Sequence, residues 1–180
     1  SDTNYLMVIR DITERRRAEH AAEEGRQLFQ LIAEASPDLI YIYDKMLDRN
    51  VYANAGVTTI LGYSAAQVQA LGPALLPTLA HPDDLAAMLA FNARVCRAQP
   101  GEVLELEYRM RHADGDYRWL YGREVLLSRD PEGRPHLMLG VAQDVTARKL
   151  AELERAALRA SEQEVLRRSD EARALLDTLI

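Results

Sequence analysis

The hydrophobic and polar positions of this chain alternate most regularly between residues 102 and 111. Every second residue there is apolar, which is the period of a strand with one buried face. The apolar positions are Leu104, Leu106, Tyr108 and Met110. An Asp-Gly pair follows at residues 114 and 115, the dipeptide most typical of a two-residue hairpin turn. The pattern therefore predicts a β-hairpin with one apolar face.

A two-residue turn fixes which residues of this hairpin face each other. The predicted pairs on the apolar face are Met110 with Trp119, Tyr108 with Tyr121, and Leu106 with Arg123. In this register Arg123 points inward, where a guanidinium needs an acidic partner or an anionic ligand. A turn one residue longer, or a place at the sheet margin, would instead let Arg123 reach water. The sequence leaves both interpretations open.

Shorter patterns on either side of the hairpin predict the remaining elements. β-Branched and aromatic runs between turn residues indicate strands, and spacings of three and four with Gly or Pro at the ends indicate helices. The expected strands are 39–43, 50–53 and 136–146, and the expected helices are 54–62, 64–71 and 81–98. In the last helix Asn92 interrupts an apolar stripe. Its amide either lies at the edge of the stripe, satisfied by backbone, or points into a cavity.

Longer helical patterns flank this domain. Residues 14–35 place small and apolar side chains at steps of three and four, as in a helix that pairs with another helix or packs on its own domain. Residues 147–180 show two such runs, with a step of five between Ala160 and Val165. Such a break locally alters the winding of a coiled coil. It marks either a two-state element in a parallel homodimer or an irregular or solvent-facing segment.

An internal repeat organises the chain. Asp11 and Thr13 match Asp144 and Thr146 at one common offset of 133 residues. Because repeats of this kind reflect repeated structural units, residues 1–13 are expected to be the last strand of a preceding domain or a linker. The expected organisation is that strand, a linker helix at 14–35, a complete domain at 36–146 and an output helix at 147–180.

Composition narrows the classes of function. The net charge is −6 and no basic stripe is interleaved with aromatic residues, which argues against a nucleic-acid partner. No run of about 20 apolar residues exists, so we expect no membrane contact from this segment. Cys96 is the only cysteine, which excludes an internal disulfide framework and suits the cytoplasm. The histidines lack metal-ligand spacing, and no acid, base and nucleophile form a catalytic pattern. We therefore expect neither a metal site nor catalytic residues.

Several segments together resemble the PAS sensory domain. They are ASPDLIYIYD, ANAGVTTILGYS, HPDDLAAML, EYRMRHADGDYRWLYG and GVAQDVTARKLAE. The resemblance spans roughly Leu28 to Lys149, and the N-terminal YLMVIRDITERRRAE is similar to the closing motif of a second PAS domain. It implies an α+β fold in which a five-stranded antiparallel sheet carries short helices on one face and encloses a small pocket. Coiled-coil-type helices would flank this domain at both ends.

The pocket that the resemblance implies has candidate residues on the apolar faces of the predicted long helix and hairpin. They are Met88, Asn92, Tyr108, Trp119, Tyr121 and Arg123. With Asn92 and Arg123 in the pocket, the expected ligand is a small polar or anionic metabolite. The cofactor stays unknown. Cys96 lies too late in the chain for the reactive cysteine of LOV-type flavin receptors, and His81 precedes the helix in which haem-binding PAS domains carry their ligand.

A second implied site is the Asp-x-Thr junction between the last strand and the output helix. Asp144 and Thr146 are expected to fix the angle at which the strand enters the helix, and Asp11 and Thr13 are the equivalent pair of the repeat. Arg148, four residues after Asp144, is the expected partner of that carboxylate. Thr146 is also expected to cap the helix.

By this resemblance the chain is a bacterial sensory module without catalysis of its own. It would dimerise and pass a ligand- or cofactor-dependent signal through its flanking helices to a downstream PAS domain or an output domain of histidine kinase or diguanylate cyclase type. The sequence has no phosphoacceptor histidine motif, cyclase signature or Gly-rich nucleotide loop. The alternative is a ligand-free spacer that only sets helix geometry, which a pocket filled by Tyr108, Trp119 and Tyr121 would favour.

Overall fold

A computed structural model describes residues 13–99 and 101–177 of the chain. Its contacts divide the chain into two units, residues 1–37 and 38–180. The described part of the first unit is dominated by α1 (Thr13–Ala35), a helix of 23 residues with ion pairs between successive turns, such as Arg15 with Glu19. The predicted strand at the N-terminus, including Asp11, lies outside the described residues.

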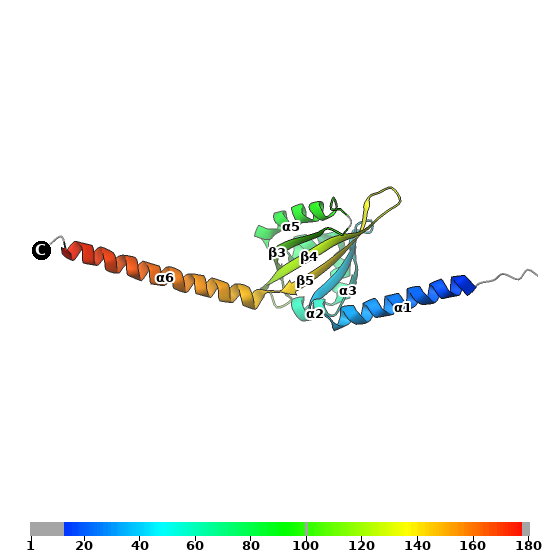
Figure 1. The fold of residues 1–180 in the computed structure, drawn as a ribbon, viewed down its shortest axis with the longest axis horizontal. Coiled ribbons are helices and arrows are strands. Elements are labelled where there is room, and N and C mark those ends of the chain that lie inside the picture. Colours follow the sequence, from blue (N-terminus) through cyan, green and yellow to red (C-terminus); the bar gives the residue numbers. More distant parts are fainter. Residues whose placement is uncertain (1–12, 100, 178–180) are drawn as a thin grey trace, which may run out of the picture. The chain divides into compact units, whose positions relative to one another are not determined.

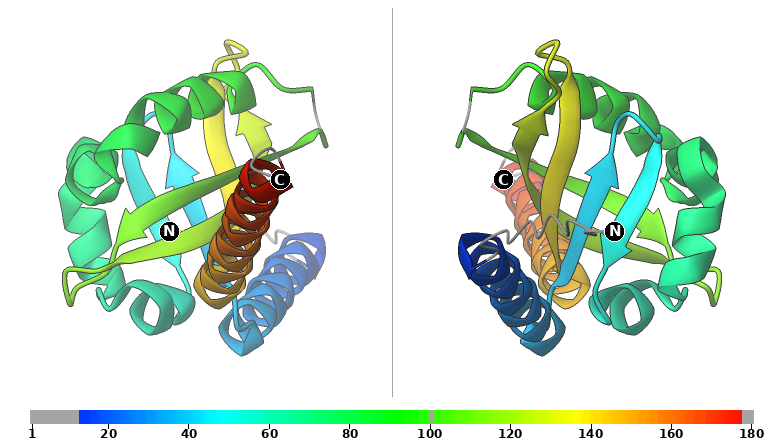
Figure 2. Two further views of the ribbon diagram at one scale, coloured as in Figure 1. Left: turned by 90° about the vertical axis from the view of Figure 1, so that its left-hand side faces the viewer. Right: turned by 90° about the vertical axis from the view of Figure 1, so that its right-hand side faces the viewer.

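The second unit is built on a five-stranded antiparallel sheet (Figures 1 and 2). Its strands are β1 (Leu39–Asp44), β2 (Arg49–Ala53), β3 (Val103–Arg111), β4 (Tyr117–Arg129) and β5 (Pro135–Asp144). They lie in the order β2-β1-β5-β4-β3, and every neighbouring pair is antiparallel. The predicted α+β fold with this sheet is confirmed.

Helical segments between β2 and β3 cover one face of the sheet, as both views of Figure 2 show. They are α2 (Gly56–Leu61), α3 (Ala65–Leu71), the 3₁₀ turn η1 (Gly72–Ala74), α4 (Leu75–Leu79) and α5 (Pro82–Val95). Local chemistry sets their starts. Ser64 and Gln67 form a reciprocal capping box at α3, and Pro82 follows the capping residue His81 at α5.

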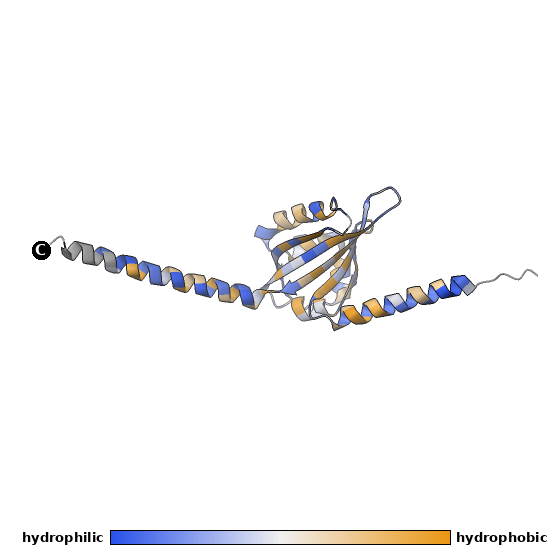
Figure 3. Ribbon diagram, in the orientation of Figure 1, coloured by the Kyte–Doolittle hydropathy of each residue, from blue (hydrophilic) through white to orange (hydrophobic). Residues whose placement is uncertain are grey.

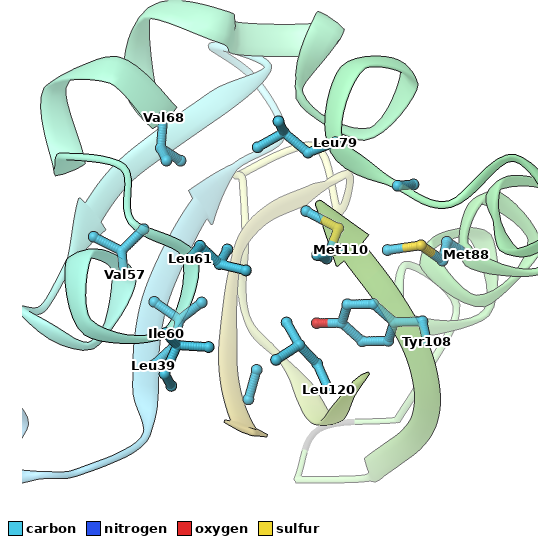
Figure 4. Packing of buried hydrophobic residues seen from close by; sticks show 12 residues of the cluster. Leu39, Val57, Ile60, Leu61, Val68, Leu79, Met88, Tyr108, Met110 and Leu120 are labelled. Carbon is cyan, nitrogen blue, oxygen red and sulfur yellow. The ribbon is translucent and has the colours of Figure 1, made fainter. Parts of the chain in front are cut away.

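The hydrophobic core lies between this helical layer and the inner face of the sheet. Figure 4 shows side chains from both layers meeting there, among them Leu61 from α2, Met88 from α5 and Leu120 from β4. A second buried cluster joins the end of α5 to β4 and β5 through Phe91, Val95, Leu126 and Met138. Removing this apolar surface from water is what holds the two layers together.

The register of the central hairpin differs from the prediction by one residue. Tyr108 faces Leu120 and Met110 faces Arg118, because the turn has three residues, 113–115, instead of two. It is closed by the His112 N–H, which donates to Asp116 O at 2.7 Å. A one-residue shift moves every side chain of a strand to the other face. Leu120, Gly122, Glu124 and Leu126 therefore point inward. The longer turn that the sequence left open is the correct interpretation.

The chain leaves the sheet through α6 (Thr146–Asp177), a continuous helix of 32 residues. The step between Ala160 and Val165 lies inside the continuous helix, and Val165 is exposed there. Hydrophilic residues predominate along α6, with apolar ones interspersed (Figure 3). Exposed apolar side chains include Leu150, Leu153 and Val165. No helix in the described ranges is long and apolar enough to cross a membrane.

Candidate functional site

A cavity of about 270 Å³ lies between the inner face of the sheet and the helices. Most of its wall is apolar, with leucines from α2, α4 and α5 and methionines from α5, β3 and β5. Its polar and charged lining residues are Tyr41, Tyr43, Lys45, Asp48, Asn50, Asn92, Tyr108 and Glu124. Asp48 and Leu89 are exposed as well as lining, so the cavity reaches the surface between them. The site is thus an apolar chamber with a few polar groups, the usual composition of a small-molecule pocket.

The most buried charged group of this cavity is Glu124 on β4, which is only 7% exposed. Its Oε1 accepts a hydrogen bond of 2.5 Å from the Tyr41 hydroxyl of β1. Tyr41 can reach it because the intervening strand has glycine at position 140, where a Cβ would lie 2.2 Å from the Tyr41 ring. Burial raises the pKa of the Glu124 carboxyl, and the Tyr41 hydrogen bond and the charge of Lys45 partly oppose that rise.

A second tyrosine lies over a second glycine. The ring of Tyr108 covers Gly122, where a Cβ would be 2.8 Å from the nearest ring carbon. Burial is the main cause that raises the pKa of the Tyr108 hydroxyl, and the negative charge of Glu124 is the second. The same two causes raise the pKa of Tyr41 well above its ordinary value. Both phenols therefore stay protonated and serve as hydrogen-bond donors or acceptors in the cavity wall.

Two side-chain oxygens at this cavity have no hydrogen-bond partner in the described part of the chain. They are Glu124 Oε2 and Asn50 Oδ1. Asn50 lies at the beginning of β2 and is 4% exposed. Buried polar atoms are nearly always hydrogen-bonded in native structures, so each such exception needs an explanation.

The structure brings together only half of the predicted pocket residues. Met88 and Asn92 of α5 and Tyr108 of β3 line the cavity, and Figure 4 shows Met88 and Tyr108 pointing into the interior. The other three, Trp119, Tyr121 and Arg123, do not line it, because the corrected register places them on the outer face of β4.

The prediction that Arg123 points inward is therefore wrong. Its side chain is 56% exposed, and its Nε lies 3.2 Å from Oε1 of Glu105 across the hairpin. The inner face does carry a charged residue of β4, but that residue is the neighbouring Glu124, with the opposite sign.

The two residues weighed for cofactor chemistry also lie outside the cavity wall. Cys96 follows the last residue of α5, and its carbonyl accepts a hydrogen bond from Arg129. The ring of His81 accepts from the Asp83 N–H at the start of α5 and lies 3.3 Å from the Arg109 guanidinium. In residues 13–99 and 101–177 no cluster of three His, Cys, Asp or Glu side chains is placed to hold a metal ion.

The Asp-x-Thr junction connects the start of α6 to β4 by hydrogen bonds. Asp144 Oδ1 accepts from the Thr146 N–H at 2.8 Å, which satisfies one free amide of the first helical turn. The Thr146 hydroxyl does not cap the helix as predicted. It accepts from the Trp119 N–H of β4 at 2.9 Å, while the Val145 N–H donates to the Trp119 carbonyl at 2.8 Å. The junction is therefore hydrogen-bonded to both the N–H and the carbonyl group of Trp119 in β4.

A second set of contacts joins the first turn of α6 to β3. Glu107 accepts from Arg148 at 2.6 Å and pairs with Lys149, whose ammonium also lies 5.6 Å from the centre of the Trp119 ring. The predicted pair of Arg148 with Asp144 is wrong, because Arg148 lies on the helix surface that turns toward β3. The hydrogen bond from Lys149 is the main cause of the lowered pKa of Glu107.

Sequence reasoning missed the cavity residues that the register shift brings inward. Leu120, Gly122, Glu124 and Leu126 are at every second position of β4, so they lie on one face of the strand. Pairing the strands with the longer turn would have placed that face toward the core. Gly140 sits inside an otherwise apolar strand, a position that indicates close approach of another group. No comparable pattern singled out Asn50.

Comparison with known proteins identifies the family. The family described as PAS fold matches residues 50–142, from β2 to the end of β5. The chain therefore belongs to the PAS family, a class of sensory signalling domains. The fold, the cavity between the sheet and the helices, and the strand-to-helix junction all agree with this assignment.

Individual relatives come from bacterial signalling proteins. The chain is 30% identical over 146 residues to the two-component sensor PprA of Pseudomonas aeruginosa, an alignment that covers 80% of this chain and 15% of that protein. A sensory box histidine kinase/response regulator structure from Burkholderia thailandensis is 30% identical with a TM-score of 0.54, covering 77% of this chain and 98% of that one. The N-terminal domain of a diguanylate cyclase with PAS/PAC sensor from Marinobacter aquaeolei is 20% identical, with a TM-score of 0.54, covering 62% of this chain and 98% of that one. The chain is thus a PAS domain similar to those of a two-component sensor and a sensory box histidine kinase.

Proposed function

We propose that this chain is a ligand-responsive PAS module that works as a parallel homodimer and passes a conformational signal through α6 to an output domain in the cytoplasm. A histidine kinase output is supported by the similarity to a two-component sensor and a sensory box histidine kinase. The chain spans about 15% of the length of that two-component sensor, so the output would lie elsewhere in the parent protein.

The observation that carries the proposal is the alternation of residues along β3 and β4. Tyr108 and Leu120 line the cavity, whereas their chain neighbours Glu107 and Trp119 hold the first turn of α6. Adjacent residues of a strand point to opposite faces of the sheet. A ligand that shifts Tyr108 or Leu120 must therefore move the backbone that carries the α6 contacts.

The alternative is a spacer that holds no ligand. It was favoured by a pocket filled with Tyr108, Trp119 and Tyr121. Because Trp119 and Tyr121 face away from the cavity, that argument loses two of its three residues. The remaining volume of about 270 Å³ supports the sensory function instead.

Two measurements on protein purified from its own host test the proposal. Native mass spectrometry should give twice the chain mass plus a small molecule for each chain. Hydrogen exchange should then differ between the loaded protein and the same protein stripped by unfolding and refolding, both in β3–β4 and in residues 146–155. In a Thr146→Val variant the difference should persist in the strands and shrink in the helix. A monomer, or a ligand-induced change confined to the cavity, contradicts the proposal.

A further inference from the structure

Two hydrogen-bond acceptors in the cavity wall have no donor among the described residues. Glu124 Oε2 and Asn50 Oδ1 both belong to side chains more than nine-tenths buried, and both residues line the cavity. Leaving such an atom without a partner weakens the fold. The cost is recovered when a bound molecule supplies an N–H or O–H group.

The sheet register places these two residues in neighbouring inward-facing rows. Glu124 shares its row with Gly140 and Tyr41, and Asn50 shares the next row with Tyr43. Glu124 already receives the Tyr41 hydroxyl on Oε1, so its position is fixed and only Oε2 is available. Glu124 is therefore a positioned hydrogen-bond acceptor, because one oxygen is held by Tyr41 and the other can accept from a ligand.

The charges of the wall argue against an anionic ligand. Among the described residues, the charged side chains that line the cavity are Lys45, Asp48 and Glu124, two acids and one base. Lys45 is attracted to Glu124 and lies 5.0 Å from the centre of the Tyr43 ring, so its ammonium already has neighbours. A carboxylate or phosphate would lie beside Glu124 and would share the single ammonium of Lys45 with Glu124 and Asp48.

The size and composition of the wall limit the rest of the molecule. A dry apolar cavity of about 150 Å³ holds a benzene-sized molecule, so about 270 Å³ suits one ring, or a chain of six or so carbons, together with a head group. Leu61, Met88, Leu106, Leu120 and Met138 are among the apolar residues that would surround that body.

We infer that the cavity binds a small, mainly apolar molecule whose hydrogen-bond-donating head group, a primary amine or a hydroxyl, is directed at Glu124 Oε2, with Asn50 as the second acceptor. This inference rests on the proposed sensory function, since it names the ligand class of the same cavity. It replaces the polar or anionic metabolite expected when Arg123 was placed inside.

Two matched series of probes test the head group on the whole chain. One is 2-phenylethylamine, 2-phenylethanol, phenylacetate and propylbenzene, and the other is hexylamine, hexanol and hexanoate. Ligand titrations followed by ¹³C-methyl NMR should shift the methyls of Met88, Met110 and Met138, which line the cavity, without any variant being needed. In each series the amine or the alcohol should bind at least about tenfold more tightly than the carboxylate, and the aromatic donors at least about tenfold more tightly than propylbenzene. Whichever of the two binds best identifies the head group.

Two carboxamide variants then assign the contact. Glu124→Gln keeps the volume and an acceptor for Tyr41, and should weaken amine binding by about tenfold or more while changing alcohol binding less. Glu105→Gln makes the same chemical change on the outer face of the hairpin, where Glu105 pairs with Arg123, and should leave binding unchanged.

The outcomes separate the ligand class from the sensory function. Tightest binding of the carboxylates, equal binding of propylbenzene, or a Glu124→Gln variant that binds every probe like the parent overturns the inference and leaves a ligand-binding PAS domain in place. If no member of either series shifts the methionine methyls, this inference fails, and a molecule retained in native mass spectrometry would still support the ligand dependence of the proposed function.

Discussion

The cavity and the α6 junction lie on opposite faces of the same two strands, yet they differ in whether their polar groups have hydrogen-bond partners. At the junction Asp144, Thr146 and Glu107 all have partners within 3 Å. In the cavity Glu124 Oε2 and Asn50 Oδ1 have none among the described residues. A surface that only has to hold its geometry satisfies its hydrogen bonds internally, whereas a surface that recognises another molecule leaves some of them open.

This contrast places stability and recognition on alternate residues of one hairpin. Substitutions at junction residues should lower stability, because paired groups lose their partners. At cavity residues, a substitution that removes an unsatisfied group should raise stability and impair binding. The substitutions that follow test this division, beginning with the one that disturbs the fold most.

Gly140→Ala should be the most damaging change in the cavity wall. The new Cβ would lie 2.2 Å from the Tyr41 ring, which cannot stay above Gly140 and hydrogen-bonded to Glu124. We expect a loss of about 3 kcal/mol in the free energy of unfolding, measured by urea denaturation. Adding Tyr41→Leu should recover part of that loss. Gly25→Ala, with nothing within 4 Å, is the control and should be neutral or mildly stabilising. Equal effects at both glycines would show that the close approach is not what matters.

Thr146→Val should weaken the junction without changing its shape. The valine cannot accept from the Trp119 N–H, and the expected loss in unfolding free energy is about 1 to 2 kcal/mol. Thr59→Val is a matched control, because its hydroxyl only donates at 3.3 Å to the Ala55 carbonyl on the exposed side of α2. It should change stability by less than about 0.5 kcal/mol. The comparison with the cavity breaks down if Thr146→Val costs no more than this control.

Glu124→Gln should stabilise the ligand-free protein by about 1 kcal/mol near neutral pH. Burial raises the pKa of Glu124 in the folded state, so the folded protein binds this proton more tightly than the unfolded chain does. Stability from this group is therefore lost as pH rises through the folded pKa, despite the opposing effects of Tyr41 and Lys45. Thermal unfolding from pH 4 to 8 should show the variant gaining on the parent as pH rises. Glu105→Gln should show no such gain, and a constant gap for Glu124→Gln would argue against a buried ionising group.

Glu107→Gln should have the smallest effect, about 0.5 kcal/mol, since its ion pairs with Arg148 and Lys149 are partly exposed. The pKa of Glu107 is lowered in the folded state, so its contribution is present above the unfolded pKa and lost as pH falls through the folded value. Differential scanning calorimetry should therefore show the variant and parent converging as the pH falls through the lowered pKa of Glu107, and also at high salt. A difference that survives high salt would point to a packing role for Glu107 instead.

Most of the fold was predictable because its signals are local. The alternating strand of β3, the Asp-Gly turn, and the proline and aspartates that begin α5 each depend on residues close together in the sequence. The family resemblance supplied the five-stranded antiparallel sheet, whereas its strand order comes from the structure alone. Met88, Asn92 and Tyr108 were placed correctly because they belong to elements whose faces are set by their own periodicity.

The errors came from tertiary contacts that local patterns do not encode. The longer turn between β3 and β4 is held by a tertiary contact, in which the Ala113 N–H donates to the Leu61 carbonyl of α2. That single additional residue exchanged Arg123 for Glu124 on the inner face. Arg148 was misassigned for a similar reason, since its partner Glu107 is 41 residues away in the sequence.

The unbroken length of α6 has a mechanical consequence. At 1.5 Å per residue its 32 residues form a rod about 48 Å long, anchored at its first turn by Thr146, Arg148 and Lys149. A rod of that length works as a lever, so a tilt of about 5° at the anchor displaces the far end by about 4 Å. A small shift of β3 and β4 that tilts the first turn of α6 by a few degrees is in this way converted into a displacement comparable to the spacing between neighbouring strands.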